Sequence, residues 1–204
     1  MLAKVLSFGL NGIDGYLVTI EVDISNGLPK FDIVGLGDTA IKESKERVKS
    51  AIKNSGYDYP VSSIVCNLAP ADRKKEGPHY DLGMAVAILC ATNQIDYKIT
   101  ENTVFIGELS LNGEVKKVNG VLPILIAAKE KGYTHFVIPQ ANYFEASFIE
   151  GITVNTISSL TELVESYKDP TKKLKVVEAS NFEKLKNEKS SQSMDMKNVK
   201  GQFS

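Results

Sequence analysis

The alternation of apolar and polar positions divides the first seventy residues into strands around one helix. Alternating side chains rich in β-branched residues predict four strands: Leu2 to Ser7, Tyr16 to Ile24, Lys30 to Val34 and Ser63 to Ala69. The segment SNGLPK, which follows the second strand, carries the Asn-Gly signal of a tight hairpin turn between two of them. We therefore expect a sheet that is partly antiparallel.

Helical spacing replaces alternation between the third and fourth strands. Ile41, Val48 and Ile52 share one face of a helix that Asp38 or Thr39 can cap and that runs to about residue 54. A second helix is predicted from about residue 81 to residue 93. It is apolar on nearly every side, so we expect it to be buried.

The second half of the chain mixes further strands and helices. The segment TVFIGELSLNGEVKKV predicts a hairpin that turns at Asn112-Gly113. There follow a helix over 121–131, the strand THFVIP, a short helix over 141–149, the strand ITVNTI and a helix over 158–167. This order of elements predicts an α+β domain with a mixed α/β sheet, and it does not fit an uninterrupted doubly wound sheet.

The composition changes after Asp169-Pro170, where Lys, Glu, Ser, Asn and Gln become dominant. From residue 168 to residue 204 there are nine Lys against five Asp or Glu, a local net charge of +4. We predict a domain over residues 1–168 and a flexible linker over 169–204. A solvated tail is the simpler interpretation of the lysines, and DNA binding is the alternative.

Charge and composition add few constraints on function. The 204 residues are 43% hydrophobic and carry a formal net charge of −1, so the whole chain does not resemble a nucleic-acid-binding or membrane-surface protein. The apolar run in MLAKVLSFGLNG is too short for a secretory leader and no stretch approaches about 20 apolar residues, so we expect neither a leader nor a membrane span. Cys66 and Cys90 lie in apolar runs without metal-ligand spacing, which indicates buried reduced thiols and a cytoplasmic location.

The segment GLGDTA resembles a dinucleotide-binding turn. Gly35, Gly37 and Ala40 match the G-x-G-x-x-G/A spacing between a predicted strand and a predicted helix. The preceding strands look antiparallel, however, and the next strand supplies no clear acidic residue for a ribose. We favour a tight turn that needs small residues, with Asp38 at the helix N-terminus.

Other candidate chemistry is sparse. The chain has only two histidines, His79 and His135, and neither has metal-ligand neighbours; His135 is predicted to be structural. No serine lies in a nucleophile elbow, and no phosphate-binding loop with its lysine is present. The sequence therefore predicts neither a metal site nor an ATP site in this chain.

The loop before the buried helix holds the remaining candidate site. Arg73, Lys74 and Lys75 precede Gly77-Pro78, where cations and backbone donors could hold an anion or a nucleic-acid phosphate, with His79 beside them. Solvated charges in a turn are the simpler alternative.

Three segments together resemble one family: DIVGLGDTAIKESKERVKSAI, NLAPADRKKEGPHYDLGMAVAIL and FIGELSLNGEVKKVNGVLPILIAAKEKGYTHFVIP. They are similar to the N-terminal domain of bacterial magnesium-chelatase-like AAA+ ATPases, the family that includes the competence protein ComM. The resemblance implies the ribosomal protein S5 domain 2-like fold, shared with the Lon protease domain and the RadA C-terminal domain. It also implies a role in DNA recombination during natural transformation.

The likeness to Lon bears on catalysis. Lon-type peptidases place a nucleophilic serine directly after Gly-Pro and a partner lysine after a later hairpin; the corresponding positions here are His79 and Leu122. Both members of the dyad are missing, so we expect a degenerate, non-catalytic site. Two alternatives stay open: a hydrolase that uses His79 with Asp81 or Glu76, and a pure protein-interaction module.

The segment MDMKNVKGQ, which begins at Met194, resembles the opening of the AAA+ module in the same family. The resemblance implies that the linker leads to an ATPase module absent from this chain, which would use ATP and Mg²⁺. The expected partners are DNA and other protomers of a ring-forming homo-oligomer, and no membrane is expected.

Overall fold

A computed structural model describes residues 1–179 and 187–188 of the chain. Ten strands are present in these residues: β1 (Leu2–Asn11), β2 (Asp14–Ser25), β3 (Lys30–Val34), β4 (Ser63–Ala69), β5 (Thr103–Phe105), β6 (Glu108–Leu109), β7 (Val115–Lys116), β8 (His135–Pro139), β9 (Thr153–Ile157) and β10 (Lys175–Val176). The helices are α1 (Thr39–Asn54), α2 (Asp81–Ala91), α3 (Tyr97–Thr100), α4 (Val121–Glu130), α5 (Tyr143–Ala146) and α6 (Leu160–Lys168), with short 3-10 turns at Pro78–Tyr80 and Gln140–Asn142.

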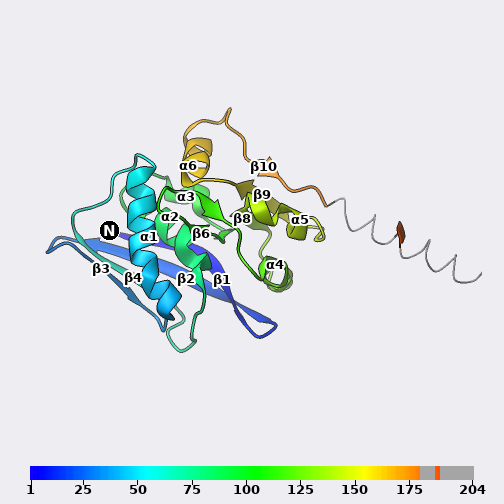
Figure 1. Cartoon of the computed structure of the whole chain (residues 1–204), viewed down its shortest axis with the longest axis horizontal. Coiled ribbons are helices and arrows are strands. Elements are labelled where there is room, and N and C mark those ends of the chain that lie inside the picture. The colour runs from blue at the N-terminus through cyan, green and yellow to red at the C-terminus, as the bar shows by residue number, and fades with distance from the viewer. Residues whose placement is uncertain (180–186, 189–204) are drawn as a thin grey trace, which may run out of the picture.

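Eight strands form one sheet in the order β10-β9-β8-β5-β1-β2-β4-β3, and β6 and β7 form a separate hairpin. The pairs β1-β2, β2-β4 and β9-β10 are antiparallel, whereas the other four neighbouring pairs are parallel. Figure 1 shows α1 over the β3 end of the sheet and α4 and α5 towards the β9 end. The predicted α+β fold with a mixed sheet is confirmed.

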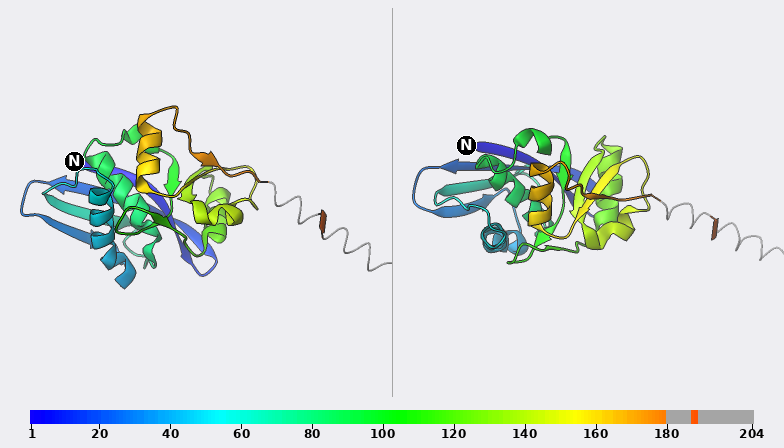
Figure 2. Two further views of the ribbon diagram at one scale, coloured as in Figure 1. Left: turned by 45° about the horizontal axis from the view of Figure 1, so that its top comes forward. Right: turned by 90° about the horizontal axis from the view of Figure 1, so that it is seen from above.

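Alternation along the strands creates a core on each face of the sheet. Val5 and Phe105 point into a cluster with α1, α2 and α6, while Phe8 and Phe136 point into a second cluster with α4. Figure 2 shows the two groups of helices from two further directions. Every residue of α2 is buried, as its apolar sequence predicted. Cys66 and Cys90 are buried free thiols, and burial raises the pKa of Cys66 to about 12.

The segment SNGLPK does not form the predicted hairpin, because β2 and β3 are not neighbours. Strand β4 inserts between them, antiparallel to β2 and parallel to β3. The hairpin that β2 does form lies at its other end, where β1 joins β2 through Gly12, which has φ +63°, and Asn11 pairs with Asp14 across the turn. A second Asn-Gly pair, at Asn11-Gly12, was the signal for that turn. The hairpin predicted at Asn112-Gly113 is confirmed by the β6-β7 pairing.

The sheet extends past the predicted domain end. Strand β10 adds to β9, with Lys175 opposite Thr156 and Val176 opposite Asn155. Part of the predicted linker therefore belongs to the sheet, while most of the remainder, including MDMKNVKGQ, lies outside the described residues. No helix in the described part of the chain is long and apolar enough to cross a membrane.

Candidate functional site

Two turns that sequence analysis treated separately are joined in the structure. Asp38 caps α1 by accepting the Ile41 N–H at 2.9 Å through Oδ1, and its Oδ2 accepts the Gly77 N–H at 3.0 Å. The Asp38 N–H also donates to the Lys75 carbonyl at 3.1 Å, while the Lys75 N–H donates to the Leu36 carbonyl at 2.9 Å. The turn before α1 and the loop before α2 therefore form one hydrogen-bonded unit.

This unit explains the small residues of GLGDTA. Gly35 has φ +107°, and a Cβ there would lie 2.3 Å from the Leu68 carbonyl oxygen. The backbone N–H of Lys75 donates to the Leu36 carbonyl, and the backbone carbonyl of Lys75 accepts from the Asp38 N–H. The Asp38 N–H is therefore not free to bind a nucleotide phosphate. The geometry agrees with a tight turn and disfavours the dinucleotide interpretation.

Lys75 is not the solvated cation that the loop suggested. Its side chain is fully buried, and its Nζ donates to the carbonyl oxygens of Gly35, at 2.7 Å, and Pro70. Burial lowers the pKa of Lys75. Its proposed role as an anion contact is therefore wrong for this conformation, because the ammonium group holds the loop together instead of facing solvent.

Arg73 and Lys74 stay on the surface, and each has a partner. The Arg73 guanidinium lies 4.8 Å from the centre of the Tyr16 ring, and Lys74 Nζ lies 3.6 Å from Glu76. The Tyr16 hydroxyl donates to the Lys74 carbonyl at 3.0 Å, which holds the loop against β2. The loop thus offers two cations to a ligand in place of the three expected.

His79 is positioned as a structural donor. Only 8% of the residue is exposed, and Nε2–H donates to the Phe8 carbonyl at 2.9 Å. Its ring lies 4.0 Å from that of Tyr80. Burial lowers the pKa of His79 to about 4, so the imidazole is neutral at pH 7. Gly77, at φ +89°, leaves room for this ring, because a Cβ there would lie 3.2 Å from His79 Nδ1.

Asp81 lies in a network that the sequence analysis missed. Its carboxylate is fully buried and accepts hydrogen bonds from Arg47 Nε at 2.7 Å, Arg47 Nη2 at 3.2 Å, Ser44 Oγ at 2.5 Å and the Leu109 N–H at 3.1 Å. Burial raises the pKa of Asp81 and the four donors act against that shift. The sequence signal for this network was Asp81 itself, a single carboxylate at the start of an otherwise apolar helix. This network ties α1, α2 and β6 together.

The hydrolase alternative finds no support in this arrangement. Asp81 is fully engaged with Arg47, Ser44 and Leu109, and Glu76 is exposed and pairs with Lys74. The hydrogen bond described for the His79 side chain goes to the Phe8 carbonyl, and the Asp38 carboxylate acts on the ring through its charge alone, so no carboxylate in the described residues hydrogen-bonds the ring as the partner of a base would.

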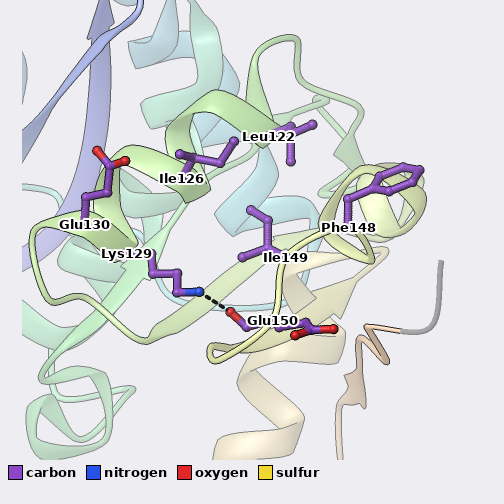
Figure 3. Close-up of a pocket in the computed structure, with 7 residues that line it drawn as sticks. All are labelled: Leu122, Ile126, Lys129, Glu130, Phe148, Ile149 and Glu150. Carbon is purple, nitrogen blue, oxygen red and sulfur yellow. Dashed lines mark hydrogen bonds between the residues drawn. The ribbon is translucent and has the colours of Figure 1, made fainter. Parts of the chain in front are cut away.

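Leu122, which the resemblance to Lon matched to the partner lysine, lies in the first turn of α4 and lines an apolar groove of about 680 Å³ with Ile126, Phe148 and Ile149 (Figure 3). Lys129 also lines this groove, and its Nζ donates to the Glu150 carbonyl at 2.6 Å. His135 is exposed at the start of β8. Within residues 1–179 and 187–188, no group of His, Cys, Asp or Glu could hold a metal ion.

Sequence comparison with known proteins identifies the family of the chain. The family model described as subunit ChlI of Mg-chelatase matches residues 20–142, which include α1, the Gly77-Pro78 turn and α2. The chain belongs to the ChlI family. It is 40% identical to competence protein ComM of Haemophilus influenzae over 164 residues, which are 80% of this chain and 32% of ComM. It is 41% identical to the uncharacterized protein YifB of Escherichia coli over 140 residues, 69% of this chain and 28% of YifB.

A more distant similarity connects this ChlI-family chain to a protease. It is 28% identical to Lon protease 2 of Bacillus subtilis over 169 residues, 74% of this chain and 30% of the protease. This agrees with the expected Lon-domain-like fold. The chain spans about a third of the length of the curated relatives that it matches.

Proposed function

We propose that this chain is the non-catalytic N-terminal domain of a magnesium-chelatase-like AAA+ ATPase that processes DNA during recombination and natural transformation. The family match and the name of the relative ComM support this proposal. In the whole protein a separate module would bind ATP and Mg²⁺, and this domain would help to engage DNA or to assemble a ring of protomers in the cytoplasm.

The proposal that the domain is non-catalytic rests on the residues at and around the Gly77-Pro78 turn. The Asp38 carboxylate fixes the turn, but a neutral, buried histidine follows it and a leucine replaces the partner lysine. A nucleophile needs a base within hydrogen-bond reach, and neither part of such a pair is in place. The domain has thus kept the turn as scaffold and lacks the peptidase chemistry.

The test compares the full-length protein with a variant that lacks residues 1–168. ATP hydrolysis is measured with and without DNA, and the oligomeric state is measured by sedimentation. We expect the deletion variant to hydrolyse ATP but to lose its response to DNA or its ring. If both properties are unchanged, the proposed role in DNA engagement and assembly is wrong.

A parallel assay addresses peptide hydrolysis. The chain is incubated with casein and short peptides, alone and as His79→Ala and His135→Ala variants. We expect no turnover in any sample. Turnover that disappears only with His79→Ala would make the domain an enzyme and overturn the non-catalytic proposal.

A further inference from the structure

One flank of α1 carries a row of lysines. Ile41, Ser44, Val48, Ala51 and Ile52 turn inward to the core, whereas Lys42, Lys45, Lys49 and Lys53 follow at intervals of three and four residues along the flank beside this buried face, with Lys45 half-buried. Side chains at such intervals share one face of a helix. With a rise of about 1.5 Å per residue, the row extends over about 16 Å.

These four lysines differ from the paired cations of the domain. In the described part of the chain none of them forms an ion pair, whereas Lys4, Lys30, Lys74, Lys116, Lys117 and Lys172 each have a carboxylate partner. Glu43, on the same helix, lies 3.8 Å from Arg47. Glu46 is the one other carboxylate on α1, so the row keeps an excess of positive charge.

The row borders a hollow of about 260 Å³ between α1 and the edge strand β3. Its lining combines three lysines, one carboxylate, a serine and four ring side chains: Lys30, Lys45, Lys49, Glu46, Ser62, Phe31, Tyr59, Pro29 and Pro60. Lys49 Nζ lies 5.9 Å from the centre of the Tyr59 ring. Cations therefore lie beside flat apolar groups, the combination that suits a phosphate next to a stacked base.

We propose that this surface binds single-stranded DNA, with the phosphates along the lysine row and a base in the hollow between α1 and β3. The inference rests on the proposed function, and it moves the nucleic-acid contact from the Arg73 loop to α1. A hollow of this size holds a base but cannot accept a duplex. An acidic peptide would satisfy the lysines but would leave the Tyr59 and Phe31 rings without a stacking partner.

The test measures fluorescence anisotropy of a labelled oligothymidylate with the 204-residue chain over a range of salt concentrations. In Lys45→Gln/Lys49→Gln we expect binding about tenfold weaker, and a salt slope smaller by about 1.4 because each single-strand phosphate contact contributes about 0.7. Glu46→Gln should tighten binding about threefold, since it removes the carboxylate from the row. Tyr59→Leu should weaken binding with little change in the salt slope, because stacking is not ionic.

Two variants with the same loss of charge serve as controls. Lys116→Gln/Lys117→Gln removes two lysines around β7 and should bind like the wild type, and Arg73→Gln/Lys74→Gln tests the loop. All variants are compared by thermal unfolding, so that a loss of fold is recognised.

Three outcomes would overturn the inference. If the Arg73 and Lys74 variant loses binding while the α1 variant keeps it, DNA lies on the loop and the proposed function stands. If polyglutamate displaces the oligonucleotide as well as unlabelled DNA does, the surface recognises acidic protein. If the wild type does not bind, the α1 surface is not a DNA site; the deletion experiment on the full-length protein then decides the proposed function separately.

Discussion

Asp38 accepts the backbone N–H of Gly77 at 3.0 Å and, with its other carboxylate oxygen, caps α1 at Ile41. One side chain therefore fixes both the start of the helix that carries the lysine row and the Gly77-Pro78 turn. The small residues of GLGDTA and the Gly-Pro turn belong to this single structural unit.

Replacing Asp38 should disturb both ends of that unit. We expect Asp38→Ala to lower the free energy of unfolding by about 2 to 3 kcal/mol, because it removes a helix cap and a charge-assisted hydrogen bond. Asp38→Ser keeps a capping oxygen and should cost less. Asp96→Ala, which removes only the cap of the short helix α3 at Lys98, is the control and should cost under about 1 kcal/mol. Urea denaturation measures all three, and equal losses for Asp38→Ala and Asp96→Ala would contradict a role for the Gly77 contact.

The same substitution should cost far more stability at Lys75 than at its neighbour Lys74. Lys75→Met leaves the carbonyl oxygens of Gly35 and Pro70 without their donor in a buried site, so we expect a loss of about 2 kcal/mol. Lys74→Met changes an exposed side chain and should stay within about 0.5 kcal/mol of the wild type. Denaturant titration distinguishes the two, and an unaffected Lys75→Met variant would mean that the ammonium group contributes nothing to the fold.

The sequence predicted those features that depend on neighbouring residues. The face of α1, the full burial of α2 and the hairpin at Asn112-Gly113 follow from local spacing and turn chemistry. Local signals did not reveal that β4 separates β2 from β3, because strand pairing is decided by contacts between distant segments.

The candidate site shows the same limit. Lys75 looks like its neighbours Arg73 and Lys74 in the sequence, yet its ammonium group reaches the carbonyl oxygen of Gly35, 40 residues earlier in the chain. The Asp81 network also joins segments that are distant in sequence, at separations of 28 to 37 residues. Residue types identified the loop, but tertiary contacts determined which of its charges face solvent.

The ion pair between Asp81 and Arg47 should be worth far more than the pair between Glu43 and the same arginine. Asp81→Asn leaves Arg47 without its buried counter-charge, and we expect a loss of about 3 to 5 kcal/mol. Glu43→Gln removes an exposed partner 3.8 Å from Arg47 and should cost under about 1 kcal/mol. Equilibrium unfolding of both variants provides the comparison, and similar losses would show that the Asp81 network does not anchor α1 to α2.

Ending the chain before β10 should weaken the β9 edge of the sheet. The Val177 N–H donates to the Val154 carbonyl at 2.8 Å, and Lys175 Nζ lies 4.6 Å from the centre of the Tyr143 ring. A chain ending at residue 168 should therefore unfold at a lower urea concentration and aggregate more readily than one ending at residue 179, because it exposes the β9 edge. Light scattering and urea denaturation test this. Identical behaviour would support the boundary at residue 168 that the sequence suggested.

The two histidines provide a matched test of burial. The folded pKa of His79 is about 4, below the ordinary histidine value of 6.5, because burial disfavours the charged ring. Between these values the unfolded chain binds more protons than the folded one. The stabilisation of the fold by neutral His79 is therefore complete above pH 6.5. It is lost as the pH falls towards 4, and the loss in the free energy of unfolding is at most about 3 kcal/mol.

His79→Gln should be less stable than the wild type at pH 7, because it loses the fitted ring, but its free energy of unfolding should fall less on acidification. His135→Gln, which makes the same substitution at an exposed position, is the control for the chemical change itself. Free energies of unfolding measured across this range decide the point, and equal acid sensitivity in the wild type and His79→Gln would show that the imidazole is not held neutral in the fold.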